Sequence, residues 1–449
     1  MIKRLVHFLN TWQWILLIIL LPVFLFPSSQ TAGILLVVPF FWLLILFDKT
    51  RLNQRTPLDL PLGILAVMTC ISALVTPDFA ASLPKLSGMA LGFWIFLILN
   101  ARINSTRNRW IALTAFLLSG LAIAIAGLFG AGFFGSKIPI IGSIAAAMPK
   151  LASGLPGAEN GFHPNEIAGS LLWVLPVLAG LFLFLLFESK IVIKKTGFSV
   201  LIFGFLITGL VSLFVLIVFL LTESRTAYLG LFIGAIFTVP FLIRSKKISL
   251  ILSLVLIGVM ILGGIWFIND QPDFLQGSAS VENVKLSTIT IQNRIELWDR
   301  AVQAIRDFPL TGMGMNIFRQ AIEPLYPLIS IPPGTDLGHA HNEYLQIALD
   351  LGVPGLIGYL SLLISSFWML RRVLIEPQNK LVESQPSGDR LLARFLAGSI
   401  VWAIIGHGVF GLADAVALGA KPGFLFWMLL GFIPGLFFLK ENENQESSV

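Results

Sequence analysis

The stretch that says most about the fold is residues 197–243, which reads GFSVLIFGFLITGLVSLFVLIVFLLTESRTAYLGLFIGAIFTVPFLI. Two long apolar runs in this stretch are separated by a short polar turn that carries Glu223 and Arg225. A helix that spans a membrane needs roughly 20 predominantly apolar residues. The stretch therefore predicts two transmembrane helices, at 197–221 and 226–243, that are joined by a tight turn at one membrane face.

Similar apolar runs recur along all 449 residues. The chain is 56% hydrophobic and only 12% charged, with a mean hydropathy of +0.88, whereas soluble domains carry roughly twice that charge. Its one cysteine, Cys70, excludes an internal disulfide and a thiolate metal cluster. We predict an all-α integral membrane protein with about twelve transmembrane helices. The predicted spans are residues 11–26, 31–47, 58–75, 86–100, 110–129, 167–187, 197–221, 226–243, 248–268, 353–370, 391–412 and 422–439.

The loops divide the predicted bundle into three parts. Residues 1–268 hold the first nine spans, residues 269–352 form a large loop, and residues 353–449 hold the last three spans and a tail. The large loop is too long to serve only as a connection, and helical patterning within it predicts amphipathic helices. A second loop on the same side, at about 130–166, is rich in Gly, Ala and Pro.

The basic residues orient the chain. Alternate loops that begin with Lys3 and Arg4 hold 20 of the 30 Lys and Arg residues, and the large loop and the short loops on its side hold five each. Basic residues concentrate on the cytoplasmic side of inner membranes. We therefore predict a multi-pass cell membrane (inner or plasma membrane) protein with both termini cytoplasmic and the large loop extracytoplasmic. The net charge of +6 is then an orientation signal, and nucleic acid is not an expected partner.

The turn after the first run of the quoted stretch contains the first candidate site residue. Arg225 must lie at or just inside the membrane boundary, where a charge is costly unless it is paired or hydrated. One interpretation is an interfacial anchor or a local pair with Glu223. The other is a cation that faces a lipid-linked anion.

The large loop contains a second candidate within an amphipathic pattern. Asn293 predicts a helix N-cap, with Glu296 three residues later as in a capping box and four residues before a potential ion-pair partner, Arg300. Arg294 then falls in the first turn, where free backbone N–H groups and a guanidinium can bind an anion. The other interpretation of Arg294 is a solvated residue at a frayed helix end. The predicted apolar stripe is Ile295, Trp298, Val302 and Ile305.

Two histidines precede a third helical pattern, which ends at Gly352. A helix N-terminus favours the neutral imidazole, so His341 is a candidate base near neutral pH. A structural role for both His339 and His341 is the other interpretation. No third ligand follows at a familiar zinc spacing, so we predict no metal site. In the other outer loop, His163 and Asn165 either cap the helix that follows or help to close the site.

Taken together, these motifs resemble the O-antigen ligase/polymerase superfamily. Their order and spacing cover roughly residues 160–370. The segments that carry the resemblance are Glu223-Ser224-Arg225-Thr226-Ala227, Arg294-x-x-x-Trp298, Pro309-Leu310-Thr311-Gly312-Met313-Gly314, His339-Ala340-His341-Asn342-x-x-Leu345-Gln346 and Leu351-Gly352-x-x-Gly355.

The resemblance implies a membrane glycosyltransferase with a GT-C-like architecture. Members transfer a glycan from undecaprenyl diphosphate to an acceptor hydroxyl at the outer leaflet, without a metal or another cofactor and with inversion at the anomeric carbon. Arg225 and Arg294 match the arginines that hold the diphosphate in ligases of the family. His341 matches the histidine that assists the acceptor hydroxyl, and His339 is a second candidate. Asn342, Glu343, His163 and Asn165 are expected to support the site.

Several alternatives stay open at this point. The sequence does not separate a ligase from a polymerase, and the acceptor is a glycan, a lipid or a protein. A transporter of inorganic carbon or another small solute is the second hypothesis, and it predicts ionisable residues or broken helices near the middle of the membrane. The candidates here lie at the outer boundary, with His407 as the main exception. A scaffold or receptor is the third hypothesis, and it leaves Arg225, Arg294 and His341 unexplained.

Overall fold

The part of the chain that the structure describes is helical. In the computed structural model, the helices of the described residues are joined by turns and irregular segments, and the only strand-like pairing among these residues is an isolated β-bridge between Ala131 and Phe162. Much of the outer loop predicted at 130–166, and residues 271–290 of the large loop, lie outside the described residues. The described residues are 2–47, 55–103, 105–133, 143–144, 162–243, 246–270, 291–331, 337–375, 388–416 and 418–446.

Helices follow one another with short connections. The elements are α1 (Ile2–Leu25), η1 (Ala32–Leu36), α2 (Val37–Phe47), α3 (Asp59–Val75), α4 (Phe79–Arg102), α5 (Thr106–Gly130), α7 (Pro164–Phe187), α8 (Ser189–Thr196), α9 (Phe198–Leu221), α10 (Arg225–Leu242), α11 (Lys246–Asp270), α13 (Ile291–Asp307), α14 (Phe318–Leu325), α15 (Glu343–Leu374), α16 (Gly388–Phe410), η4 (Lys421–Gly423) and α17 (Phe424–Glu446).

Every predicted span coincides with a helical segment in the described residues. Seven segments, on α4, α5, α7, α9, α15, α16 and α17, are long and apolar enough to cross a membrane, as an integral membrane protein requires. Five shorter apolar segments of 10–17 residues lie where the other spans were predicted, on α1, η1–α2, α3, α10 and α11. The count of twelve spans stays a prediction, because these shorter segments do not meet the same length criterion.

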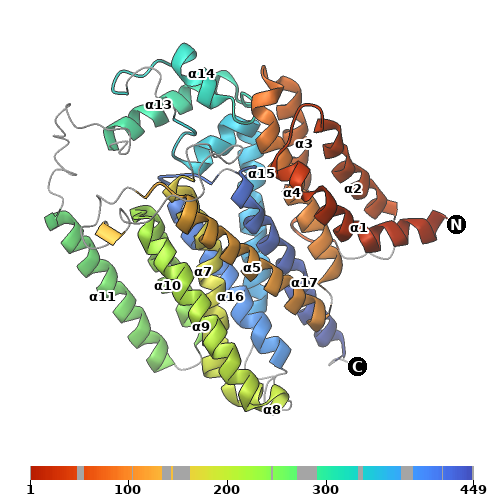
Figure 1. Cartoon of the computed structure of the whole chain (residues 1–449), viewed down its shortest axis with the longest axis vertical. Helices are drawn as coiled ribbons and strands as arrows, with labels where there is room; N and C mark the ends of the chain where they lie inside the picture. The colour runs from red at the N-terminus through yellow and green to blue at the C-terminus, as the bar shows by residue number, and fades with distance from the viewer. Residues whose placement is uncertain are drawn as a thin grey trace.

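The helices pack as a bundle with the described loop helices at one end. Figure 1 shows α13 and α14 at the top of the view and α8 at the opposite end. Within the bundle, α16 packs between α7 and α10, while α15 contacts α3, α16 and α17. Close approach of α10 and α16 depends on small residues, because a Cβ added to Gly230 would lie 2.2 Å from the carbonyl oxygen of Gly406.

The face of α13 that packs against the protein differs from the predicted stripe. Leu297, Ala301 and Ala304 are buried, whereas Ile295 is 57% exposed. These small residues let α13 approach a core that includes Phe318 of α14 and the first turns of α15. The predicted stripe is therefore wrong at Ile295, whereas Trp298 donates to the Ala340 carbonyl and Ile305 packs against the core.

The start of α13 also differs from the prediction. The helix is already formed at Ile291, so Asn293 lies inside the first turn and is not the N-cap. Glu296 does not close a capping box, because its carboxylate accepts the backbone N–H groups of Ile329 and Ser330. Arg300 contacts Asp299 and Gln303, and it also keeps a favourable charge interaction with Glu296, as predicted for this i,i+4 pair. Glu296 instead connects α13 to the backbone of the loop at Ile329 and Ser330.

A break in α15 connects the loop to the membrane. Gly352 has φ +69° within α15, and the chain on either side of it is helical. The broken helix finds substitute partners in the preceding loop: the Met313 N–H donates to the Leu349 carbonyl at 2.7 Å, and the Val353 N–H donates to the Pro309 carbonyl at 2.8 Å. The predicted helix end at Gly352 is thus a kink between two helical halves, held by the Pro309–Gly314 motif.

Candidate active site

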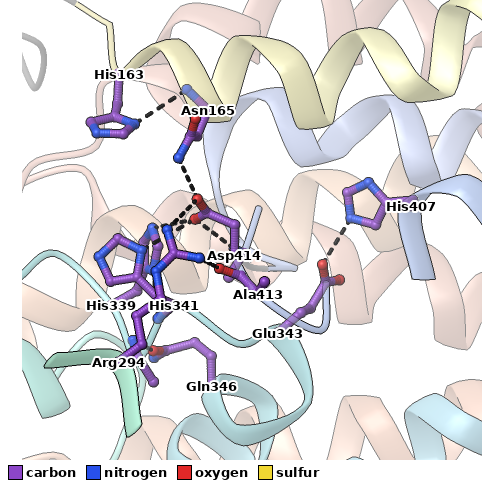
Figure 2. Close-up of polar contacts among 12 residues, drawn as sticks. His163, Asn165, Arg294, His339, His341, Glu343, Gln346, His407, Ala413 and Asp414 are labelled. Carbon is purple, nitrogen blue, oxygen red and sulfur yellow. Dashed lines mark hydrogen bonds and ion pairs between the residues drawn. The ribbon is translucent and has the colours of Figure 1, made fainter. Parts of the chain in front are cut away.

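Five side chains form a polar cluster at the end of the bundle where α13 lies (Figure 2). Its centre is Asp414, which is 1% exposed and lies in the turn that follows α16. We call this group the Asp414 cluster. Its members come from α7, α13, the segment before α15 and the turn after α16, and they are Asn165, Arg294, His339, His341 and Asp414.

The Asp414 carboxylate contacts each of the other four side chains. Oδ1 lies 3.4 Å from Nδ1 of His341 and 3.6 Å from Nε2 of His339. Oδ2 lies 3.9 Å from Nη2 of Arg294 and accepts a hydrogen bond from Nδ2 of Asn165. Segments that are far apart in the sequence therefore meet at one carboxylate.

The surroundings keep the Asp414 carboxylate charged. Burial alone raises the pKa of Asp414, but the electrostatic interactions with His341, His339 and Arg294 outweigh burial. The net effect holds the pKa of Asp414 below its usual range. A buried carboxylate that stays ionised can orient and stabilise a neighbouring imidazolium.

His339 uses both ring nitrogens within the cluster. Its Nδ1 accepts the backbone N–H of His341 at 3.0 Å, so the neutral ring carries its proton on Nε2, which faces Asp414. Burial, and next the charge of His341, lower the pKa of His339 to about 3, against the opposing effect of Asp414. His339 is thus neutral at neutral pH, with its Nε2–H facing the Asp414 carboxylate at 3.6 Å.

His341 differs from its neighbour in both backbone and side chain. It has φ +47°, in a region that non-glycine residues rarely adopt and that costs about 1–3 kcal/mol. Its Nδ1 approaches Asp414 at 3.4 Å without completing a hydrogen bond. α15 begins two residues later, at Glu343, with Asn342 as the N-cap that accepts the Leu345 N–H at 3.0 Å.

The peptide between the two histidines is held from both sides. The indole N–H of Trp298 donates to the Ala340 carbonyl at 3.1 Å, and Oε1 of Gln346 accepts the Ala340 N–H at 2.9 Å. Nε2 of Gln346 in turn donates to Asp350 at 2.8 Å. Trp298 and Gln346, which belong to the motifs of the resemblance, therefore keep residues 339–341 in place.

Arg294 lies in the first turn of α13, as predicted, and points toward the turn after α16. Its Nη1 donates to the carbonyl of Ala413, and its Nη2 faces Asp414. A guanidinium carries five N–H donors in a planar fork. The chain uses only part of this capacity, so Arg294 can contact Asp414 and a bound anion at the same time.

Three buried polar atoms of the cluster make no hydrogen bond within the described residues. They are Nε of Arg294, Nδ1 of His341 and Oδ1 of Asn165. Folded proteins leave few buried polar atoms unsatisfied, and each such atom calls for an explanation. Their concentration around one carboxylate indicates a place where a polar ligand binds.

Arg225 begins α10 at the same end of the bundle. Gly230 faces Gly406 and Gly234 faces Trp402, so α10 and α16 run antiparallel. In an antiparallel pair, residues that precede Gly230 on α10 lie beside residues that follow Gly406 on α16. Arg225 therefore lies at the level of the turn that follows α16. Glu223 also attracts its guanidinium, so a local ion pair and an anion site both stay predictions for Arg225.

The segment before α7 caps that helix, as predicted, and its role in closing the site stays a prediction. His163 is the N-cap of α7, and its Nδ1 accepts the backbone N–H of Asn165 at 3.3 Å. The Asn165 side chain points the other way, toward Asp414 (Figure 2). His163 thus caps the helix, and Asn165 belongs to the Asp414 cluster.

Asp414 supplies the third candidate metal ligand that the spacing in the sequence did not reveal. His339, His341 and Asp414 each offer a ligand atom within 4.8 Å of the others. A histidine ligand normally donates its second ring N–H to a carbonyl or a carboxylate. His339 instead accepts an N–H at Nδ1, which leaves the proton on the Nε2 atom that a metal would need. That the site holds no metal stays a prediction, which the hydrogen bond at Nδ1 of His339 favours.

A comparison with protein-family models agrees with the motifs. Residues 210–360 match the O-antigen ligase family. The resemblance is therefore confirmed over about a third of the chain. This O-antigen ligase segment contains Arg225, Arg294, His339 and His341, whereas Asn165 and Asp414 lie outside it. A search of curated proteins found no match.

Sequence reasoning missed Asp414, the residue that joins the cluster. Asp414 lies 73 positions after His341 and follows a predicted span, so neither motif spacing nor helical period connects the two. The available signal was an acidic residue in a very short outer connection, at Leu412-Ala413-Asp414. A charge at a membrane boundary generally requires a partner.

Proposed function

We propose that the protein transfers a glycan from undecaprenyl diphosphate to an acceptor hydroxyl at the outer leaflet. The O-antigen ligase segment supports a membrane enzyme of the ligase or polymerase type. The observation that carries the proposed mechanism is the meeting of Arg294, His341 and Asp414, from three separate segments, at one end of an apolar bundle. The bilayer, the lipid-linked donor and a glycan, lipid or protein acceptor are the proposed partners.

His341 is the proposed base. Asp414 faces its Nδ1 and favours a ring with its proton there, which leaves Nε2 to accept a proton from the acceptor hydroxyl. The acceptor oxygen forms a bond to the anomeric carbon as the bond from that carbon to the diphosphate oxygen breaks. The acceptor proton goes to His341, and the bonding electrons leave with the diphosphate.

Arg294, and Arg225 at the same level, are the proposed diphosphate ligands. Negative charge grows on the leaving oxygen during the reaction, and a prepositioned guanidinium stabilises that charge more than the ground state. The free donors of Arg294 are the direct support for this role. His339 acts on Asp414 and not on the acceptor, because both of its ring nitrogens already have partners.

The proposed reaction is metal-independent and inverts the anomeric carbon. Diphosphate is a good leaving group, and arginine can supply the cationic charge that a metal provides elsewhere. A single displacement, in which the acceptor attacks opposite the leaving diphosphate, inverts that carbon. We further propose twelve spans in a GT-C-like architecture, with cytoplasmic termini and an extracytoplasmic large loop.

A transporter is not favoured. Transport sites usually lie near the middle of the membrane, where helices of both halves are interrupted. The Asp414 cluster instead lies at the end of the bundle beside α13, in segments that flank the helices. The kink in α15 at Gly352 belongs to the same end, because it is bonded to the loop at Pro309.

The test uses cells that lack the native gene and express single variants. We expect Arg225→Ala, Arg294→Ala and His341→Ala to abolish surface polymer and to cause undecaprenyl-diphosphate-linked glycan to accumulate. Arg300→Ala, on the same helix α13 but outside the Asp414 cluster, is the matched control and should restore polymer. Wild-type polymer in all three site variants, at equal protein levels, would refute the mechanism.

A further inference from the structure

A second polar group lies inside the bundle beside the Asp414 cluster. Nε2 of His407, on α16, lies 2.8 Å from Oε2 of Glu343, and the two side chains are only 2% and 3% exposed. The hydroxyl of Tyr359 donates to Oε1 of Glu343 at 3.1 Å. Figure 2 shows this pair pointing away from the histidines of the Asp414 cluster, so the proposed reaction does not use it.

The Glu343–His407 pair shares one proton. Nδ1 of His407 lies 3.3 Å from the carbonyl of Gly169, which can only accept, so Nδ1 carries a hydrogen. A proton then remains between Nε2 and the carboxyl of Glu343, and the pair is neutral overall wherever that proton rests. Neutrality and full hydrogen bonding explain how two ionisable groups are tolerated in an apolar interior.

Little space surrounds the pair. The ring of His407 stacks on Trp173 with centroids 4.1 Å apart. The adjoining cavity, lined also by Val416 and Phe426, has a volume of about 10 Å³, which holds at most roughly one water. Bulk solvent has no room to enter, so the arrangement of the pair depends mainly on its own contacts.

Three further contacts fasten the start of α15 to the end of α16. The Glu343 N–H donates to the Gly411 carbonyl at 2.8 Å, the side chain of Asn342 donates to the Leu412 carbonyl at 2.9 Å, and the hydroxyl of Tyr344 donates to the Gly408 carbonyl at 3.0 Å. Residues 342–344 are thereby held along residues 407–412. His341 precedes the first segment directly, and Asp414 follows the second by two residues.

The backbone of His341 needs such support. A bulky residue at φ +47° persists only where its surroundings determine the conformation. The contact at Ala340 holds the chain before His341, and the Glu343–His407 pair holds it after. Loss of either support allows His341 to relax away from Asp414.

We propose that the buried Glu343–His407 pair is a positioning device that sets the distance between His341 and Asp414. This inference rests on the proposed function, because it concerns the alignment of the proposed base. The pair acts through hydrogen-bond geometry and packing, and it touches neither donor nor acceptor. Misplacement of a reacting group by about 1 Å can cost on the order of 100-fold in rate.

The test measures initial rates with purified protein and lipid-linked donor extracted from cells that lack the gene. The double variant Glu343→Leu/His407→Leu removes both polar groups, so it should keep the fold, since apolar replacement of a whole buried pair is often neutral. We expect its kcat to fall by about 10–100-fold, with an unchanged KM for the donor and an unchanged melting temperature. Glu343→Gln preserves the hydrogen bonds to His407 and Tyr359 and should restore kcat to within about threefold.

The outcomes separate this inference from the proposed function. If the double leucine variant keeps wild-type kcat while His341→Ala is inactive, the positioning role is wrong and the proposed function stands. If His341→Ala itself keeps wild-type activity, the proposed function is wrong. If Glu343→Gln is as slow as the double variant although it melts normally, the charge of Glu343 matters, and a purely geometric role is refuted.

Discussion

The Glu343–His407 pair lies next to the Asp414 cluster, at the start of α15 and the end of α16, but the two groups have different roles. Both contain a buried carboxylate that contacts imidazole. In the Glu343–His407 pair, every ring nitrogen and carboxylate oxygen has a partner. In the Asp414 cluster, three buried polar atoms have none within the described residues, and His341 holds a strained backbone.

The difference shows how buried polar groups can be sorted by role. A fully satisfied group with no room for a ligand stabilises an arrangement, whereas a partly satisfied group next to a strained residue can bind one. The charge of Asp414 is therefore expected to matter for the reaction, and the charge of Glu343 is not. The predictions below test this contrast.

The largest expected effect comes from neutralising the carboxylate of the Asp414 cluster. We expect Asp414→Asn to lower kcat by about 100- to 10,000-fold, because the base loses the charge that orients it and stabilises its protonated form. Steady-state rates with the lipid-linked donor measure this loss. Asp299→Asn, at a side chain on α13 that is 62% exposed, is the control and should leave kcat unchanged. Equal losses in Asp414→Asn and Glu343→Gln would remove the contrast between the two regions.

The next effect concerns the unused donors of Arg294. Arg294→Lys keeps a positive charge but loses the planar fork that contacts Ala413 and an anion together. We expect kcat/KM for the donor to fall by about 100-fold or more, as for the loss of one transition-state donor. Arg300→Lys should stay within about twofold of the wild type. A fully active Arg294→Lys enzyme would show that only the charge at this position is needed.

A smaller effect is expected from a change at Gly352, where α15 is broken and bonded to the large loop. Gly352→Ala places a Cβ about 2.6 Å from the Leu310 carbonyl at a φ of +69°, so it should destabilise the protein by about 1–3 kcal/mol. Thermal unfolding in detergent measures the change. Gly258→Ala in α11 is the matched control, because its Cβ meets nothing within 4 Å. An unchanged melting temperature in Gly352→Ala would show that the break in α15 is not held as described.

The smallest effect is a pH dependence of stability. The pKa of His339 is about 3 in the folded protein and about 6.5 when the chain unfolds. Between these two pKa values, only the unfolded chain binds a proton at His339. The contribution of His339 to the free energy of unfolding is therefore highest above pH 6.5, and it decreases progressively as the pH falls toward 3. The wild type should therefore lose more stability between pH 7 and pH 5 than His339→Gln does. Identical losses in the two proteins would contradict a His339 that stays neutral in the folded protein.

Sequence reasoning succeeded where the property is local. Apolar runs such as 197–221 and 353–370 coincide with helices, because the length and hydropathy of a segment decide whether it can form a helix in lipid. Arg294 lies in the first turn of α13, as predicted. The motif at 339–346 places both histidines beside a capped helix start for the same reason, since capping depends on neighbouring residues.

Tertiary structure decided what joins these local pieces. Asp414 contacts residues 73 and 120 positions away, and no period in the sequence connects them, because contact between helices depends on how the helices pack. Packing also decided that Ala301 is buried on α13 and that Ile295 is exposed. Glu296 accepts the backbone N–H of Ile329 in the loop and does not cap α13. The sequence by itself determined an apolar helical chain with arginines and histidines flanking its spans. The fold determined which carboxylate they share, because only a packed bundle brings such distant groups within hydrogen-bond range.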